Sequence, residues 1–194
     1  MRFHRYRLAL GAAALLALFW LTACLAPGQN SSMRGMHAMH KLSSEYEFLV
    51  EMIPHHQEAV DSSMLASART QRPELKVFVD TIVSDQAREI ALMGGWLQAW
   101  YPGKSTEAAY SPMMRPVEGL SADRADRAYL EDMIMHHRMA VMMADGLLKA
   151  RFTVRPELAD FARGIIAAQN AEIEQMETWL RDWYGASGSS HMMH

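Results

Sequence analysis

Two stretches of the chain carry the same pattern of side chains that can bind a metal ion. Each contains adjacent histidines, His55-His56 in the first and His136-His137 in the second, and a methionine, Met52 or Met133, stands just before each pair. Further along, each pair is followed by a matching block with three more potential donors: Gln86, Glu89 and Met93 in the first copy, and Gln169, Glu172 and Met176 in the second. Imidazole, carboxylate and thioether groups at a repeated spacing indicate a metal site.

The repeated unit is predicted to be a helical hairpin. Arg72-Pro73-Glu74-Leu75 recurs as Arg155-Pro156-Glu157-Leu158, and proline is well tolerated in the first turn of a helix. After each proline, apolar residues recur in steps of three and four, which places them on one helix face. Two such hairpins predict an all-α fold, a closed four-helix bundle. We place repeat one at 43–101, an irregular linker at 102–120 and repeat two at 121–184.

Polar residues interrupt the apolar face of the predicted helices at equivalent positions in both repeats. Glu89 and Glu172 lie on this face, and a carboxylate in a protein core must be paired, protonated or bound to metal. His56 and His137 also fall on the apolar face, so the alternative is that they only hydrogen-bond these two carboxylates across the core. Paired histidines in both copies favour a metal site over that alternative.

Acidic residues also precede the histidines. Glu51 and Asp132 lie four residues before His55 and His136, one helical turn away. We expect them to orient those two rings or to act as ligands.

The N-terminus has the features of an export signal. Arg2, Arg5 and Arg7 precede an apolar run from Leu8 to Trp20, which is too short for a comfortable membrane span. Leu21-Thr22-Ala23-Cys24 then fits a bacterial lipobox and contains the one cysteine of the chain. We expect residues 1–23 to be removed and Cys24 to carry a lipid, which would leave the protein membrane-anchored and facing the periplasm or the cell surface. The alternative is ordinary signal cleavage near Ala23.

Methionine and histidine also gather outside the predicted bundle. The chain has 17 methionines, and several lie in a tether at 24–42 and a tail at 185–194, both predicted to be flexible. Thioether and imidazole donors together suit copper, especially Cu(I). The possible tail ligands are Met36, His37, Met39, His40, His191, Met192, Met193 and His194. The alternative is that these tail residues have no metal role. The net charge of −3 gives no reason to expect nucleic-acid binding.

The joint pattern M-I-x-H-H-x-x-A-V and Q-x-x-E-I-x-x-M-x-x-W-L, present in both repeats over 43–184, resembles domain-of-unknown-function family 305. The resemblance implies an exported, ferritin-like four-helix protein that binds copper and is linked to copper tolerance, without an established reaction. The family pattern continues as A-V-x-M-A. The second repeat keeps its methionine as Met143, whereas the first has Ser62, which implies a softer, more Cu(I)-like second repeat.

We therefore predict an exported, lipid-anchored protein, not an enzyme, that sequesters copper or hands it to a copper-handling protein partner. One alternative is a ferritin-like di-metal oxidase, although the Glu-x-x-His pairs expected of that class are missing. Another is an interaction lipoprotein whose histidines only stabilise the core. The oligomeric state, the number of copper ions, and the choice between one shared site and two separate sites stay open.

Overall fold

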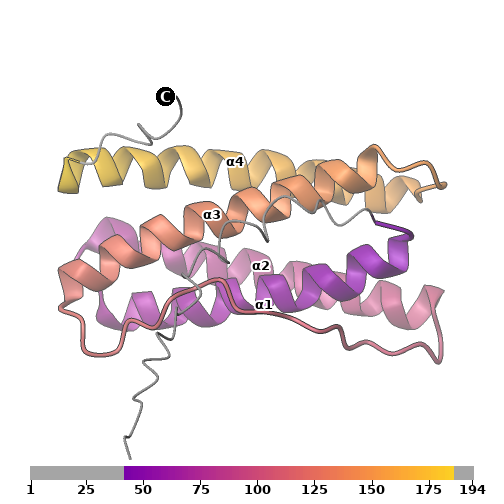
Figure 1. Cartoon of the computed structure of the whole chain (residues 1–194), viewed down its shortest axis with the longest axis horizontal. Coiled ribbons are helices and arrows are strands. Elements are labelled where there is room, and N and C mark those ends of the chain that lie inside the picture. Colours follow the sequence, from indigo (N-terminus) through magenta and orange to yellow (C-terminus); the bar gives the residue numbers. More distant parts are fainter. Residues whose placement is uncertain (1–41, 186–194) are drawn as a thin grey trace, which may run out of the picture. The chain divides into compact units, whose positions relative to one another are not determined.

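A computed structural model describes residues 42–185. This part of the chain contains four helices and no strand, which confirms the predicted all-α, four-helix fold (Figure 1). The helices are α1 (Glu45–Arg69), α2 (Pro73–Trp100), α3 (Ala122–Leu148) and α4 (Pro156–Tyr184). Among the described helices, none is long and apolar enough to cross a membrane.

Local sequence signals set the helix ends. The Ser44 hydroxyl accepts from Glu47 N at the start of α1, and the Ser121 hydroxyl accepts from Arg124 N at the start of α3. These N-caps satisfy backbone donors that have no partner within the helix. Pro73 and Pro156 are the first residues of α2 and α4, as their sequence context predicts. The α4 helix ends at Gly185, whose φ of 61° lies in the left-handed region that glycine adopts easily.

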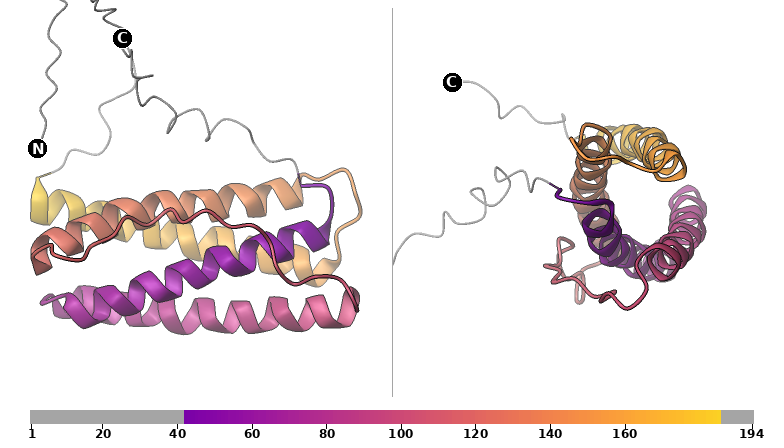
Figure 2. Two further views of the ribbon diagram at one scale, coloured as in Figure 1. Left: turned by 60° about the horizontal axis from the view of Figure 1, so that its bottom comes forward. Right: turned by 90° about the vertical axis from the view of Figure 1, so that its right-hand side faces the viewer.

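The helices pack as a four-helix bundle. Helix α1 packs on α2, α3 packs on α4, and the two hairpins meet along α1 and α3. Helices α2 and α4 are set further apart, as the end-on view in Figure 2 shows, but their aromatic side chains meet toward both ends. The ring centroids of Trp96 and Phe161 lie 5.2 Å apart, and those of Phe78 and Trp179 lie 5.0 Å apart. Between these two contacts, polar side chains of α2 and α4 line a groove.

The core consists of two apolar clusters, one toward each end of the bundle. Each fully buried aliphatic side chain contributes about 1.5–3 kcal/mol to folding. The first cluster includes Phe48, Leu49, Met52, Met93, Leu97, Leu147, Leu158 and Ile165. The second includes Leu75, Val79, Tyr129, Leu130, Met133, Ile173 and Met176. Along every helix, the polar residues singled out by the repeat lie between these two clusters, so they form a polar layer across the middle of the bundle.

The segment between the hairpins runs back along the outside of α1 and α3 (Figure 2). It contains no helix between Tyr101 and Ser121. Its backbone is attached to the bundle midway, where the N–H groups of Met113 and Met114 donate to the Glu58 carboxylate at 2.8 and 3.0 Å. The segment therefore covers the α1–α3 side of the polar layer, whereas the α2–α4 side stays open.

Candidate metal centre

The four histidines of the repeats are all buried in the polar layer. His55 and His136 are 2% and 1% exposed, and His56 and His137 are 0% exposed. All four rings point inward, including those of His55 and His136. The reason is that the α1–α3 contact and the linker together cover the side on which His55 and His136 lie.

His55 and His136 stack on each other at the centre of the layer. Their ring centroids lie 3.7 Å apart with an interplanar angle of 34°. Neither ring nitrogen of His55 has a hydrogen-bond partner, and Nδ1 of His136 has none, whereas Nε2 of His136 lies 3.3 Å from a Glu58 carboxylate oxygen. Burial, and then the proximity of the other histidines, holds the pKa of His55 well below its usual value. Burial likewise lowers the pKa of His136. Both rings are therefore neutral at pH 7, the state in which imidazole nitrogen binds metal.

His56 and His137 form the outer members of the layer. His56 Nε2 is hydrogen-bonded to Glu89 Oε2 at 2.8 Å, and His137 Nε2 lies at the same distance from Glu172 Oε2. The first contact is the cross-core hydrogen bond that the non-metal alternative predicted, whereas the second has the distance but not the geometry of a hydrogen bond. A carboxylate at one ring nitrogen is also how proteins orient a metal-binding histidine, and the Nδ1 atoms of both rings have no partner. These contacts therefore suit either role.

The carboxylate beside the stacked pair is Glu58, which the sequence interpretation missed. Its Oε2 lies 3.3 Å from His136 Nε2, and Tyr110 donates its hydroxyl to the same atom. Burial opposes ionisation of Glu58. The His136 ring, the Tyr110 hydroxyl and the two backbone N–H groups of the linker outweigh burial and lower the Glu58 pKa to about 2. The available sequence signal was its position three residues after His55, on the same helix face.

Asp132, which we expected to orient the His136 ring or to bind a metal ion, instead accepts hydrogen bonds from the linker. Its carboxylate accepts from Arg115, through the backbone N–H at 2.9 Å and through the guanidinium. The prediction was wrong because an arginine from a segment outside the repeat competes for this carboxylate.

The predicted methionine ligands lie close to the layer in sequence and are buried with the apolar clusters. Met52, Met93, Met133 and Met176 are all 0% exposed, two in each cluster. Met143 is half-buried and packs against the first cluster. Gln86 and Gln169, each 3% exposed, belong to the layer itself on α2 and α4. The predicted ligands Cys24, Met36, His37, Met39, His40, His191, Met192, Met193 and His194 lie outside the described residues.

The stacked His55 and His136 could bind a metal ion without a change of the fold, but their rings would have to turn. Within residues 42–185, no three His, Cys, Asp or Glu side chains converge around one point. In stacked imidazoles the lone pairs lie in the ring planes and do not point at each other. A metal ion bound by both His55 and His136 therefore requires a change of side-chain rotamer. No hydrogen bond of the His55 ring resists this change, whereas the His136 ring would have to alter its contact with Glu58.

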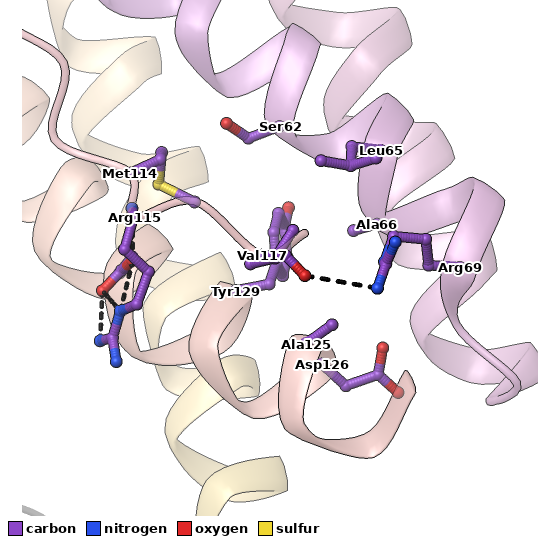
Figure 3. A pocket seen from close by; sticks show the side chains of 11 residues that line it. Ser62, Leu65, Ala66, Arg69, Met114, Arg115, Val117, Ala125, Asp126 and Tyr129 are labelled. Atoms are coloured by element: carbon purple, nitrogen blue, oxygen red, sulfur yellow. Dashed lines mark hydrogen bonds and ion pairs between the residues drawn. The ribbon is translucent and has the colours of Figure 1, made fainter. Parts of the chain in front are cut away.

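A separate hollow beneath the linker is too small for a ligand. It lies between α1 and α3 and is bordered by Ala66, Arg69, Val117 and Tyr129 (Figure 3). The Arg69 guanidinium donates across it to the carbonyls of Val117 and Leu120. Its volume of about 40 Å³ has room for no more than a few water molecules.

A comparison with protein families identifies the family of this chain. The family model described as a domain of unknown function, DUF305, matches residues 45–180 and, in a second alignment, residues 126–194. The chain belongs to the DUF305 family. No curated protein sequence matches this DUF305 chain.

Solved structures of other family members share the fold. CopM in the Cu(I)-bound form is 37% identical, covers 74% of this DUF305 chain and 100% of its own, and has a TM-score of 0.66. CopM in the Cu(II)-bound form is 36% identical, with coverage of 72% and 97% and a TM-score of 0.62. A DUF305 fragment from Deinococcus radiodurans is 28% identical, with coverage of 73% and 98% and a TM-score of 0.64.

Proposed function

We propose that this protein binds copper in the polar layer, with His55 and His136 as the central ligands, and that it sequesters the ion or hands it over. The observation that carries the proposal is the pair of buried, stacked imidazoles, in which both nitrogens of His55 and Nδ1 of His136 have no hydrogen-bond partner. Buried polar groups in folded proteins nearly always have a partner, and unpartnered ones require an explanation. A ligand that binds to them provides one. CopM, a family member, has been solved with Cu(I) and with Cu(II).

The surroundings favour a soft ion. Fully buried thioethers lie one turn from the histidines on α1 and α3, at Met52 and Met133. Thioether and imidazole are the donors that suit Cu(I), and they persist in oxidising compartments where thiols do not. His56 and His137, oriented by Glu89 and Glu172, are the next ligands available. No reaction step is needed for this role, so we propose a carrier and not an enzyme.

The remaining parts of the chain fit capture and delivery. A lipid on Cys24 would hold the bundle at a membrane, on the periplasmic or outer side. The methionine- and histidine-containing segments at 24–42 and 185–194 would collect ions for the layer or pass them to a partner protein.

The test is an anaerobic Cu(I) titration of the whole chain against a competing chelator. The main variant is His55→Phe/His136→Phe, which keeps two stacked rings and removes their nitrogens. Its matched control is Ser63→Ala, because Ser63 is also buried on α1 but pairs with Tyr129 away from the histidines. We expect the control to keep the tightest copper equivalent and the double variant to lose it.

Other results would assign the protein differently. Equal Cu(I) affinity in the double variant and the wild type would indicate that copper binds to the tails and not to the stacked histidines. No competitive binding in either protein would favour the interaction lipoprotein. Dioxygen consumption with bound iron would favour the di-metal oxidase.

A further inference from the structure

A groove lies between α2 and α4 at the level of the polar layer. Its volume is about 330 Å³, and much of its polar lining comes from equivalent positions of the two repeats. Gln86 and Glu89 contribute from α2, and Gln169 and Glu172 contribute from α4. The groove therefore presents two carboxylates and two amides from two helices whose aromatic side chains meet elsewhere along their length.

Two carboxylates of the groove, those of Glu89 and Glu172, have no lysine or arginine partner among the described residues. Asp85 also lines it, but its carboxylate is paired with Arg88 on the same helix. Glu89 and Glu172 have side chains 26% and 20% exposed, and their ion-pair partners are the imidazoles of His56 and His137. Within residues 42–185, no lysine or arginine lies within ion-pair distance of either carboxylate. Two half-buried carboxylates lining one groove repel each other, and a cation between them would remove that repulsion.

The amides give an independent indication of a ligand. Gln86 and Gln169 are each 3% exposed and line the same groove. Neither Nε2 nor Oε1 of Gln86 has a hydrogen-bond partner, and Oε1 of Gln169 has none. A buried amide without partners destabilises the fold, and here it occurs at equivalent positions of both repeats. Both amides have a carbonyl oxygen available for coordination.

We propose that the α2–α4 groove binds a divalent cation through oxygen atoms of Glu89, Glu172, Gln86 and Gln169. This site is separate from the stacked histidines and takes a different class of ion. Carboxylate and amide oxygens suit hard cations such as Mg²⁺, Ca²⁺ and Mn²⁺, whereas the imidazole and thioether groups of the core suit copper. Binding would join α2 to α4 at the level of the polar layer, in addition to the aromatic contacts between these helices.

Mn(II) is the probe, because it prefers oxygen donors and its free aqueous ion gives a strong EPR signal. The whole chain is titrated with Mn(II) alone at neutral pH, and bound Mn(II) is measured as the loss of this signal. We expect one equivalent to bind. In Glu89→Gln/Glu172→Gln, which keeps the shape but removes both charges, we expect that equivalent to be lost or its affinity to fall about 100-fold.

Three further variants make the result specific. Asp85→Asn lies on the same wall, but its carboxylate is already neutralised by Arg88, so it should bind Mn(II) like the wild type. Gln86→Leu/Gln169→Leu retains both carboxylate–histidine contacts and should weaken Mn(II) binding about 10-fold, which separates lost ligands from a lost fold. His55→Phe/His136→Phe should keep Mn(II) binding even if it loses Cu(I), so the two proposals fail independently. No Mn(II) binding by the wild type, or unchanged binding by Glu89→Gln/Glu172→Gln, overturns the proposal.

Discussion

The imidazole of His55 lies against that of His136, with ring centroids 3.7 Å apart, although the two residues belong to different repeats. Each hairpin therefore supplies one ring to the centre of a single layer, flanked by His56 on one helix and His137 on the other. An ion at the centre would take ligands from both hairpins. The contact between α1 and α3 thus favours one shared site over two separate ones.

A shared site predicts that single and double variants have the same effect on copper binding. His55→Phe or His136→Phe alone should each lower Cu(I) affinity by more than the ~10–100-fold that loss of a second-shell partner costs. The double variant should lose little more, because the effects of residues in contact are not additive. Anaerobic competition titrations of the three variants measure this. Two separate sites would instead leave one copper equivalent at full affinity in each single variant.

The two repeats differ in one potential copper ligand, and in a shared site this ligand would come from the second repeat alone. Met143 on α3 corresponds to Ser62 on α1, so the softer donor is present on the second hairpin only. Met143→Leu preserves the packing of a half-buried side chain against the first cluster and removes the sulfur. We expect Cu(I) affinity to fall while Cu(II) affinity is unchanged. Equal losses for both ions would contradict a role for the thioether.

The buried amide of Gln86 predicts a stabilising substitution. Both of its polar atoms lack partners, so Gln86→Leu should raise the free energy of unfolding of the metal-free protein by about 1–2 kcal/mol. Gln169→Leu is the matched comparison, because Oε1 is the one polar side-chain atom of Gln169 that is buried without a partner, and it should stabilise less. Chemical denaturation of the two variants beside the wild type measures the difference. Destabilisation by Gln86→Leu would show that this amide has partners in solution.

Glu58 predicts that the linker and the bundle are coupled. Its carboxylate accepts from Tyr110 and from the backbone of Met113 and Met114, so Glu58→Gln should destabilise the fold by about 2 kcal/mol. Amide hydrogen exchange should accelerate at the linker more than in the helices. Glu118→Gln is the control, since Glu118 is an exposed linker residue. Unchanged exchange at Met113 and Met114 in Glu58→Gln would mean that other contacts hold the linker.

The shifted pKa values predict two steps of acid destabilisation in the metal-free protein. The pKa values of His55 and His136 lie below the 6.5 of an unperturbed histidine, so below pH 6.5 the unfolded chain binds more protons and stability falls. The pKa of Glu58 is lowered from 4.5 to about 2, so its contribution is present above pH 4.5 and is lost as pH falls through about 2.

Variants assign the two steps. Unfolding free energies between pH 7 and pH 3 should show a weaker slope below pH 6.5 in His55→Phe/His136→Phe. Glu58→Gln should lack the decline that begins near pH 4.5. A wild type whose stability is flat from pH 7 to pH 5 would mean that the histidines are accessible to protons in the folded state.

The fold could be predicted from the sequence because its signals are local and occur twice. Helical spacing of apolar residues, a proline at the first position of α2 and α4, and serine caps before α1 and α3 each act within a few residues. The donors of the layer were also identified from the sequence, because Glu89, Glu172 and the histidine pairs interrupt an apolar face at equivalent positions.

The tertiary structure decided which of those donors meet. The stacking of His55 on His136 depends on the packing of α1 against α3. The linker, which lies outside the repeat, decides the roles of two carboxylates. Tyr110 of the linker donates to Glu58 beside the stacked rings, and Arg115 of the linker donates to Asp132. The groove between α2 and α4 likewise depends on how far apart the bundle holds two helices that look alike in sequence. The sequence by itself determined the helices and their polar positions, since these depend on neighbours along the chain. Contacts between segments far apart along the chain decided the site and the groove, since helical periodicity says nothing about which faces pack together.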